Sequence, residues 1–202
     1  GERSEGAFQE DLIAGRGGDS PEPAEATRVI RAAINASPVA RARWLTYARR
    51  PLATPGAAVE FVSCQACPLR ALPVFVEASG SELALVESLK QEQVVVHAGQ
   101  PIVREGQADT PLYTLLQGWA FRFKTLSDGR RQILNFLLPG DFIGVQQKMG
   151  DAAAHGVGAL SDVLLCVFRR DALWELHRTA PTLGFSVTWL TAHEESLIDD
   201  TL

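Results

Sequence analysis

The sequence predicts an α+β fold in which a barrel or roll of short antiparallel strands is flanked by helices. From residue 93 to residue 168, short runs rich in β-branched and aromatic residues alternate with Gly, Pro and Asp, a pattern typical of an all-β barrel or roll. On both sides of this block the apolar residues instead follow helical spacing. A chain of 202 residues can bury one such domain and carry an appendage.

The first 57 residues form an N-terminal extension that we expect to be partly disordered. Residues 1–24 are rich in Gly, Glu, Ser and Pro, a composition typical of disordered segments. Residues 24–36 then place apolar side chains at helical spacing, and Ser37 followed by Pro38 is typical of the start of a second helix. We expect that helix to end before Pro51 and its arginines to face solvent.

Two local motifs support the elements of the β-rich region. Ser79 and Glu82 have the spacing of a capping box, so a helix is expected to begin at Ser79. Asp128 and Gly129 join two strand-like runs and predict a β-hairpin whose strands cover 119–126 and 132–138.

The sequence ends in two predicted helices separated by Pro181, the second covering residues 182–202. Alternating four- and three-residue steps predict a dimerisation seam between two copies of this second helix, formed by Leu183, Val187, Leu190 and Leu197. Glu194 interrupts the pattern, and packing of the same face on the helix's own domain explains the spacing equally well. The β-rich domain between the extension and this helix is thus expected to span residues 58–181.

Composition excludes several classes of protein. No apolar run of about 18 residues occurs, so a membrane-spanning helix is not expected, and the charged first residues lack the apolar core of a secretory signal. Three cysteines cannot form a complete set of intramolecular disulfides, which indicates a reducing cytoplasm. The four histidines are scattered and no nucleotide-binding glycine pattern occurs, so we do not expect an enzyme.

Three segments, in order along the chain, resemble the Crp/Fnr family of bacterial transcription regulators, in particular its Fnr/FixK-like branch. They are CQACPLR from Cys64, GQPIVREGQADTPLYTLLQGWAFRFKTLSDGRRQILNFLLPGDFIG from Gly99, and DVLLCVFRRDALWEL from Asp162. The resemblance implies a cyclic-nucleotide-binding-type antiparallel β-roll (a double-stranded β-helix, similar to a jelly roll), a long dimerisation helix and a C-terminal helix-turn-helix domain. We expect the helix-turn-helix domain to be absent, because the sequence stops inside the helix.

The resemblance also implies a ligand pocket, but the residues present do not suit cAMP. Relatives that bind cAMP place a Glu soon after the GDFIG glycine for the ribose, and then an Arg–Ser or Arg–Thr pair for the phosphate. Here Val145 and Gln146 stand where the acid would be, and AAAHG stands where the arginine would be. A buried phosphate without a paired cation is very costly, and Lys148 and His155 are the only cationic candidates in this stretch. We therefore expect no response to cAMP.

By the same resemblance, Cys64, Cys67 and Cys166 occupy positions that hold an iron–sulfur cluster in Fnr-type oxygen sensors. A [4Fe–4S] cluster takes a thiolate at each of its four sites. One expected cysteine is missing here, because the sequence reads Leu-Pro-Val at residues 72–74 where it should lie. We therefore expect no cofactor, with an iron–sulfur cluster at these cysteines as an alternative.

Other roles for the cysteines also stay open. A redox-active thiol pair or a zinc site completed by another group would use Cys64 and Cys67. A purely structural role is favoured for Cys166, because it shares one face of its predicted strand with Leu164 and Phe168.

We interpret the chain as the sensor and dimerisation domain of a Crp/Fnr-type regulator, a cytoplasmic homodimer that does not respond to cAMP. A change in the roll or at the cysteines would alter helix pairing and so the spacing of the DNA-reading domains. DNA is then a partner only through the absent helix-turn-helix domain, and the hairpin at Arg130 and Arg131 resembles a surface that Fnr-type activators present to RNA polymerase. The alternative is a stand-alone module that binds a small ligand or senses redox state without binding DNA.

Overall fold

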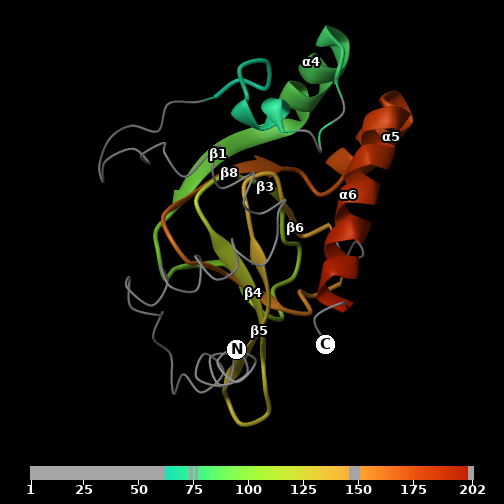
Figure 1. The fold of residues 1–202 in the computed structure, drawn as a ribbon. Helices are drawn as coiled ribbons and strands as arrows, with labels where there is room; N and C mark the ends of the chain where they lie inside the picture. Colours follow the sequence, from blue (N-terminus) through green and yellow to red (C-terminus); the bar gives the residue numbers. More distant parts are fainter. Residues whose placement is uncertain (1–61, 73–74, 76, 146–150, 200–202) are drawn as a thin grey trace, which may run out of the picture.

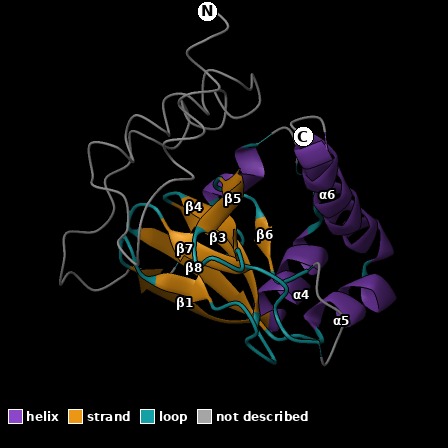
Figure 2. Ribbon diagram, turned by 90° about the horizontal axis from the view of Figure 1, so that it is seen from below, coloured by secondary structure: helices purple, strands orange, loops and turns teal. Residues whose placement is uncertain are grey.

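The computed structural model describes residues 62–72, 75, 77–145 and 151–199, with side chains described as far as residue 191. These residues form two four-stranded antiparallel sheets, with helices gathered at one side of them (Figures 1 and 2). The predicted N-terminal extension, with its disordered start and two helices, lies outside the described residues.

We call the two sheets A and B. Sheet A contains, in spatial order, β1 (Lys90–Val96), β8 (Val163–Phe168), β3 (Leu112–Gln117) and β6 (Phe142–Ile143). Sheet B contains, in spatial order, β2 (Pro101–Val103), β7 (Gly156–Ala159), β4 (Ala120–Thr125) and β5 (Arg131–Leu137). Every neighbouring pair is antiparallel, so the predicted antiparallel roll is confirmed.

Apolar side chains from both sheets fill the space between them. This interior cluster consists of Ile102, Val103, Leu115, Ala120, Leu137, Ile143, Ala153, Val157, Ala159, Val163 and Leu165. Because strand residues alternate between faces, each strand that contributes to this cluster also presents a second set of side chains on the outside of the roll. The two outer faces differ, and they are described below.

The hairpin predicted at Asp128 and Gly129 is confirmed, since β4 and β5 pair from Ala120–Leu137 to Thr125–Arg131. Gly129 has φ +83°, in the left-handed region that favours glycine. The turn is closed by a hydrogen bond from the Leu126 amide to the Arg130 carbonyl, at 2.8 Å.

In the described part of the chain, three α-helices and one short 3₁₀-helix accompany the roll. Helix α4 (Gly80–Leu89) begins with the predicted capping box, in which the Glu82 amide donates to the Ser79 hydroxyl and the Ser79 amide donates to the Glu82 carboxylate. Helices α5 (Ala172–Thr179) and α6 (Pro181–Asp199) are separate, so the predicted break at Pro181 is confirmed. The 3₁₀-helix η1 (Pro68–Ala71) follows the first two cysteines.

The α-helices pack on one another around a cluster of Leu89, Ala172, Leu176 and Ala180. Leu85 and Val86 of α4 pack against it, as does Phe168 at the end of β8. Figure 1 shows α5 and α6 side by side next to the roll, with α4 near β1. No helix in the described part of the chain is long and apolar enough to cross a lipid bilayer.

Candidate functional site

The first two cysteines lie in a loop on the outer face of sheet A. We call residues 62–72 the cysteine loop. The Cys67 amide lies 3.4 Å from the Cys64 carbonyl, and the Arg70 amide donates to the Cys67 carbonyl at 3.2 Å, at the start of η1. Pro68 occupies the first position of η1, where a missing amide hydrogen costs nothing.

The third cysteine meets this loop from the middle of sheet A. Cys166 lies on β8, opposite Gln93 of β1 and Thr114 of β3. Its side chain belongs to a buried outer cluster with Leu69, Leu72, Leu116 and Leu164, and the partly buried Cys67, Phe75 and Phe168 pack against that cluster. The predicted shared face of Leu164, Cys166 and Phe168 is thus confirmed, and Cys67 and Cys166 reach the same apolar cluster.

A buried lysine attaches the cysteine loop to sheet A. The Lys90 side chain is only 1% exposed, and its Nζ forms an ion pair with Glu87 Oε1 at 2.8 Å. The same Nζ donates to the Val62 carbonyl at 2.9 Å, and the other Glu87 oxygen accepts from the Cys64 amide. Gln93 adds a hydrogen bond in each direction with the Val62 backbone. Sequence reasoning missed this attachment, because a lysine at the start of a strand gives no signal of burial.

Burial raises the pKa of all three thiols. It raises the pKa of Cys64 to about 12, although the positive charge of Lys90 acts in the opposite direction. Burial likewise raises the pKa of Cys67 and of Cys166. The Cys166 sulfur also accepts a hydrogen bond from Gln93 Nε2 at 3.3 Å. Thiols in this state are protonated near neutral pH, whereas metal binding and nucleophilic attack need the thiolate.

Whether the three cysteines hold an iron–sulfur cluster stays a prediction, as does the expected absence of a cofactor. Within the described ranges, no group of three or more His, Cys, Asp or Glu side chains lies close enough to hold a metal ion. At the position of the missing ligand, Leu72 is buried in the outer cluster, and Pro73 and Val74 lie outside the described residues. None of the three cysteines forms a disulfide.

The interior of the roll holds one arginine that the sequence reasoning did not identify. Arg122 on β4 is 3% exposed, and its Nη2 donates to the Phe142 carbonyl at 2.7 Å. His155, one of the two cations predicted for the ligand pocket, is half-buried nearby, and its pKa is lowered by burial and then by the positive charges of Arg122 and Lys124. The other, Lys148, lies outside the described residues together with Gln146, whereas Val145 is half-buried.

A second arginine connects two loops of the roll to the helical region. Arg170 lies between β8 and α5, and its Nη1 donates to the Thr110 carbonyl at 3.0 Å and to the Gly144 carbonyl at 2.9 Å. The acceptors lie just before β3 and just after β6. One guanidinium group therefore joins two loops of the roll to the start of the helical region.

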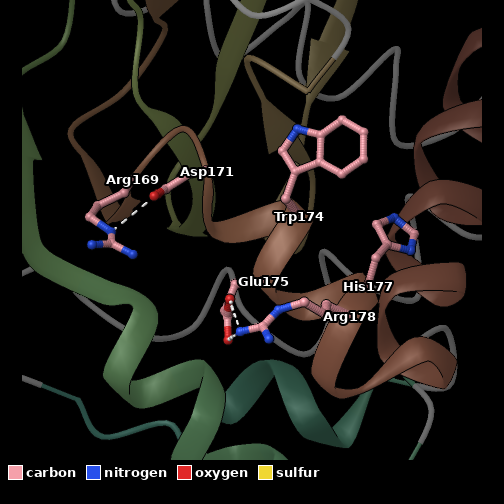
Figure 3. Close-up of a pocket in the computed structure, with 6 residues that line it drawn as sticks. All are labelled: Arg169, Asp171, Trp174, Glu175, His177 and Arg178. Carbon is pink, nitrogen blue, oxygen red and sulfur yellow. Dashed lines mark hydrogen bonds and ion pairs between the residues drawn. The ribbon is translucent and has the colours of Figure 1, made fainter.

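A surface pocket of about 500 Å³ lies beside α5. Figure 3 shows the residues that line it. Its charged residues pair among themselves: Arg169 with Asp171 at 3.2 Å, and Arg178 with Glu175 at 2.8 Å. In the same view His177 points toward α6, where its Nε2 lies 3.3 Å from the Thr188 hydroxyl. Because its cations and acids balance, this pocket has no distinct preference for a charged ligand.

Helix α6 places the predicted seam residues in different environments. Leu183 and Val187 pack against the cluster formed by α4 and α5, so they contact the chain's own domain. Leu190 is half-buried, and the side chain of Leu197 lies outside the described side chains. The pairing of two copies through this helix stays a prediction.

Comparisons with a protein-family model and with solved structures agree with the observed fold. The cyclic nucleotide-binding domain family matches residues 93–180. Among solved structures, the catabolite activator protein of Thermus thermophilus superposes with a TM-score of 0.53 at 25% identity, covering 63% of this chain and 60% of that one. A cyclic nucleotide-binding domain from Methylobacillus flagellatus gives a TM-score of 0.54 at 22% identity, covering 63% of this chain and 74% of that one.

Curated relatives are transcription regulators and not enzymes, as expected. The transcriptional activator protein FnrL of Cereibacter sphaeroides is 32% identical over 131 residues, which is 65% of this chain and 52% of FnrL. The nitrogen fixation regulation protein FixK of Bradyrhizobium diazoefficiens is 30% identical over 138 residues, 68% of this chain and 56% of FixK. The chain thus spans little more than half the length of these relatives. Its described part is the cyclic-nucleotide-binding-type domain of the Crp/Fnr family of transcription regulators.

Proposed function

We propose that this chain is the sensor and dimerisation part of a cytoplasmic Crp/Fnr-type transcription regulator, and that its roll does not respond to cAMP. The names of the relatives FnrL and FixK, as a transcriptional activator and a nitrogen fixation regulator, support the regulatory role. The observation that carries the dimerisation part is a second apolar face on α6.

This second face of α6 lies opposite the one that packs on α5. Leu183, Val187 and the buried Thr191 follow one another at four-residue steps on the inner side. Phe185 and Trp189 each lie about 160° around the helix from Val187, by the 100° rotation per residue, and are 68% and 52% exposed. The same four- and three-residue steps continue to Ala192 and Ser196, which is the spacing of a two-helix seam.

Large exposed aromatic side chains on a helix favour association, because each buries a large apolar area when a partner covers it. We therefore assign the seam to Phe185 and Trp189 rather than to Leu183 and Val187. In such a dimer a change in the roll would reach α5 through the Arg170 hydrogen bonds and then reach α6, which packs on α5.

The experiment for this part is sedimentation velocity on the unmodified chain and on two variants. Phe185→Ser should weaken dimerisation by at least about tenfold, because it removes one aromatic anchor from each copy. Trp174→Ser is the matched control, since Trp174 is 70% exposed but lies on α5. A strictly monomeric unmodified chain at high concentration would overturn the proposed dimer.

The lack of a cAMP response is supported by the cations of the roll. Arg122 is engaged by the Phe142 carbonyl, and the lowered pKa of His155 leaves it neutral near pH 7. A cyclic phosphate would therefore meet a neutral His155 and an Arg122 whose Nη2 already donates to the Phe142 carbonyl. Isothermal titration with cAMP should show no binding, and saturable micromolar binding would contradict this part of the proposal.

A further inference from the structure

The turn of the β4–β5 hairpin carries the only Asp-Gly pair in the sequence, Asp128 and Gly129. In Figure 1 this hairpin extends from the roll at the end opposite α4. The side chain of Asp128 is 47% exposed, so water reaches its carboxylate. An Asp-Gly pair is more reactive than other Asp pairs, because glycine has no side chain to keep its amide away from the aspartate carboxyl carbon.

The reaction open to such a pair is an exchange of backbone bonds. The Gly129 nitrogen attacks the Asp128 Cγ, an N–Cγ bond forms, and the amide hydrogen leaves with the carboxyl OH group as water. Water then opens the five-membered imide ring. Opening at Cγ restores aspartate, whereas opening at the main-chain carbonyl carbon of Asp128 leaves the chain running through Cγ, as isoaspartate. One water is released and one is taken up, so the step needs no other reactant.

The conformation of the turn keeps glycine at this position. Gly129 has φ +83°, in the left-handed region that other residues rarely adopt. A Cβ added there would find nothing within 4 Å, so the space beside the residue is open. The backbone requirement that selects glycine in this hairpin therefore also retains the reactive pair.

Three hydrogen bonds in the turn oppose the reaction. Asp128 Oδ1 accepts from the Arg130 amide at 3.0 Å, and Oδ2 accepts from Arg130 Nε at 2.7 Å. The Gly129 amide itself donates to the Leu126 carbonyl at 2.9 Å. The bonds from Arg130, its amide first and its side chain second, lower the pKa of Asp128, so the carboxylate stays ionised near neutral pH. An ionised carboxylate has no OH group to release as water.

We propose that Asp128 is a site of backbone isomerisation to isoaspartate, and that Arg130 suppresses this modification in the folded chain. Arg130 engages both oxygens of the carboxylate from the backbone and from the side chain. Attack therefore requires these bonds and the bond from Gly129 to Leu126 to open together, which is a local opening of the turn.

Isomerisation changes the hairpin, because isoaspartate adds one carbon to the backbone path between residues 128 and 129. The turn is closed by the hydrogen bond from the Leu126 amide to the Arg130 carbonyl, at 2.8 Å. The longer path displaces that carbonyl and also Arg131, the first residue of β5. We expect the modified hairpin to lose the closing bond and the contact of the Arg131 guanidinium with the Phe123 ring.

Incubation of the chain at neutral pH over several days tests the proposal. Isoaspartate is counted by methyl transfer from labelled S-adenosylmethionine, catalysed by a protein isoaspartate methyltransferase, and is located by fragmentation mass spectrometry. The unmodified chain should form it at least about tenfold more slowly than a synthetic peptide of residues 124–133, in which no strands hold the turn. Equal rates would overturn the proposal. So would a signal that Asp128→Glu leaves undiminished, because the longer side chain cannot form the five-membered ring.

Two adjacent arginines provide matched variants. Arg130→Ala should raise the rate about threefold, because it removes the Nε bond to Asp128 and leaves the backbone bond. Arg131→Ala removes the cation over the Phe123 ring, at 4.5 Å from its centroid, and should leave the rate unchanged. Since Arg131→Ala is the more destabilising of the two, a rate that follows overall stability would rise more in Arg131→Ala. That order, or an unchanged rate in Arg130→Ala, would overturn the role of Arg130.

Discussion

The two outer faces of the roll are covered by different physical means. On sheet A, hydrogen bonds and one ion pair from Lys90, Glu87 and Gln93 hold the backbone of residues 62–64 in one position, and small thiols and leucines fill the space below. On sheet B, aromatic rings lie on glycines. Directed polar bonds fix the register of a covering segment, whereas a flat apolar face provides binding energy with little directional preference.

The largest expected effect concerns the packing under the cysteine loop. Leu164→Ala removes a side chain that is 5% exposed and in contact with the outer cluster, so the free energy of unfolding should fall by about 3 kcal/mol. Val95→Ala, on the exposed side of β1, should change it by less than about 0.5 kcal/mol. Urea denaturation measures both. A loss below about 1 kcal/mol for Leu164→Ala would show that the cysteine loop is not well packed.

The second effect concerns the outer face of sheet B, where the Phe123 ring lies against Gly156. Gly156→Ala places a Cβ 2.3 Å from the Phe123 ring and should destabilise the fold by about 2 kcal/mol, since the ring must move. Gly80→Ala is the control, because nothing lies within 4 Å of the added atom. Thermal unfolding compares the two variants, and equal melting temperatures would mean that the Phe123 ring moves at little cost.

A further effect, which depends on pH, concerns the Cys64 thiol in the loop on sheet A. The unfolded Cys64 thiol ionises near its ordinary pKa of 9.0, whereas the folded thiol keeps its proton up to a pKa of about 12. Between these values the unfolded state has released a proton that the folded state retains, so stability falls as the pH rises from 9 towards 12. Cys64→Ser should show a shallower fall in urea denaturation over this range. Identical slopes for the two proteins would contradict the burial of this thiol.

The smallest effect lies at the edge of the same outer face of sheet B, where Arg131 covers the Phe123 ring. Arg131→Ala removes the cation over the Phe123 ring and should cost about 0.5–1 kcal/mol. Arg130→Ala removes only an exposed pair with Asp128 on the same turn and should cost less than about 0.5 kcal/mol. Chemical denaturation at low and high salt distinguishes them, and a larger loss for Arg130→Ala would reverse this assignment.

Much of the fold could be predicted from local patterns. The capping box at Ser79, the hairpin at Gly129 and the break at Pro181 each depend on a few adjacent residues, and all three are confirmed. The shared face of Leu164 and Cys166 follows from alternation along one strand, and it too is confirmed.

Features that depend on contacts distant in sequence could not be predicted in the same way. The run 120–123 alternates correctly, but alternation does not say that Arg122 rather than Phe121 faces the interior. On α6 two faces carry apolar residues at seam spacing, and only the packing of α5 shows that Leu183 and Val187 belong to the chain's own core. Lys90 is buried because the Val62 carbonyl and Glu87 meet it there, which requires the tertiary structure.

The hydrogen bonds of Arg170 have a consequence for how this domain can diverge. Both of its acceptors, at Thr110 and Gly144, are backbone carbonyls, which every amino acid possesses. The link therefore does not use the side chains of these two loops, although position 144 itself needs glycine, since its φ is +91° and an added Cβ would lie 2.8 Å from the Pro111 carbonyl oxygen. A lineage that changed its ligand, or lost one, would keep the same mechanical link as long as the arginine and the loop backbone were preserved.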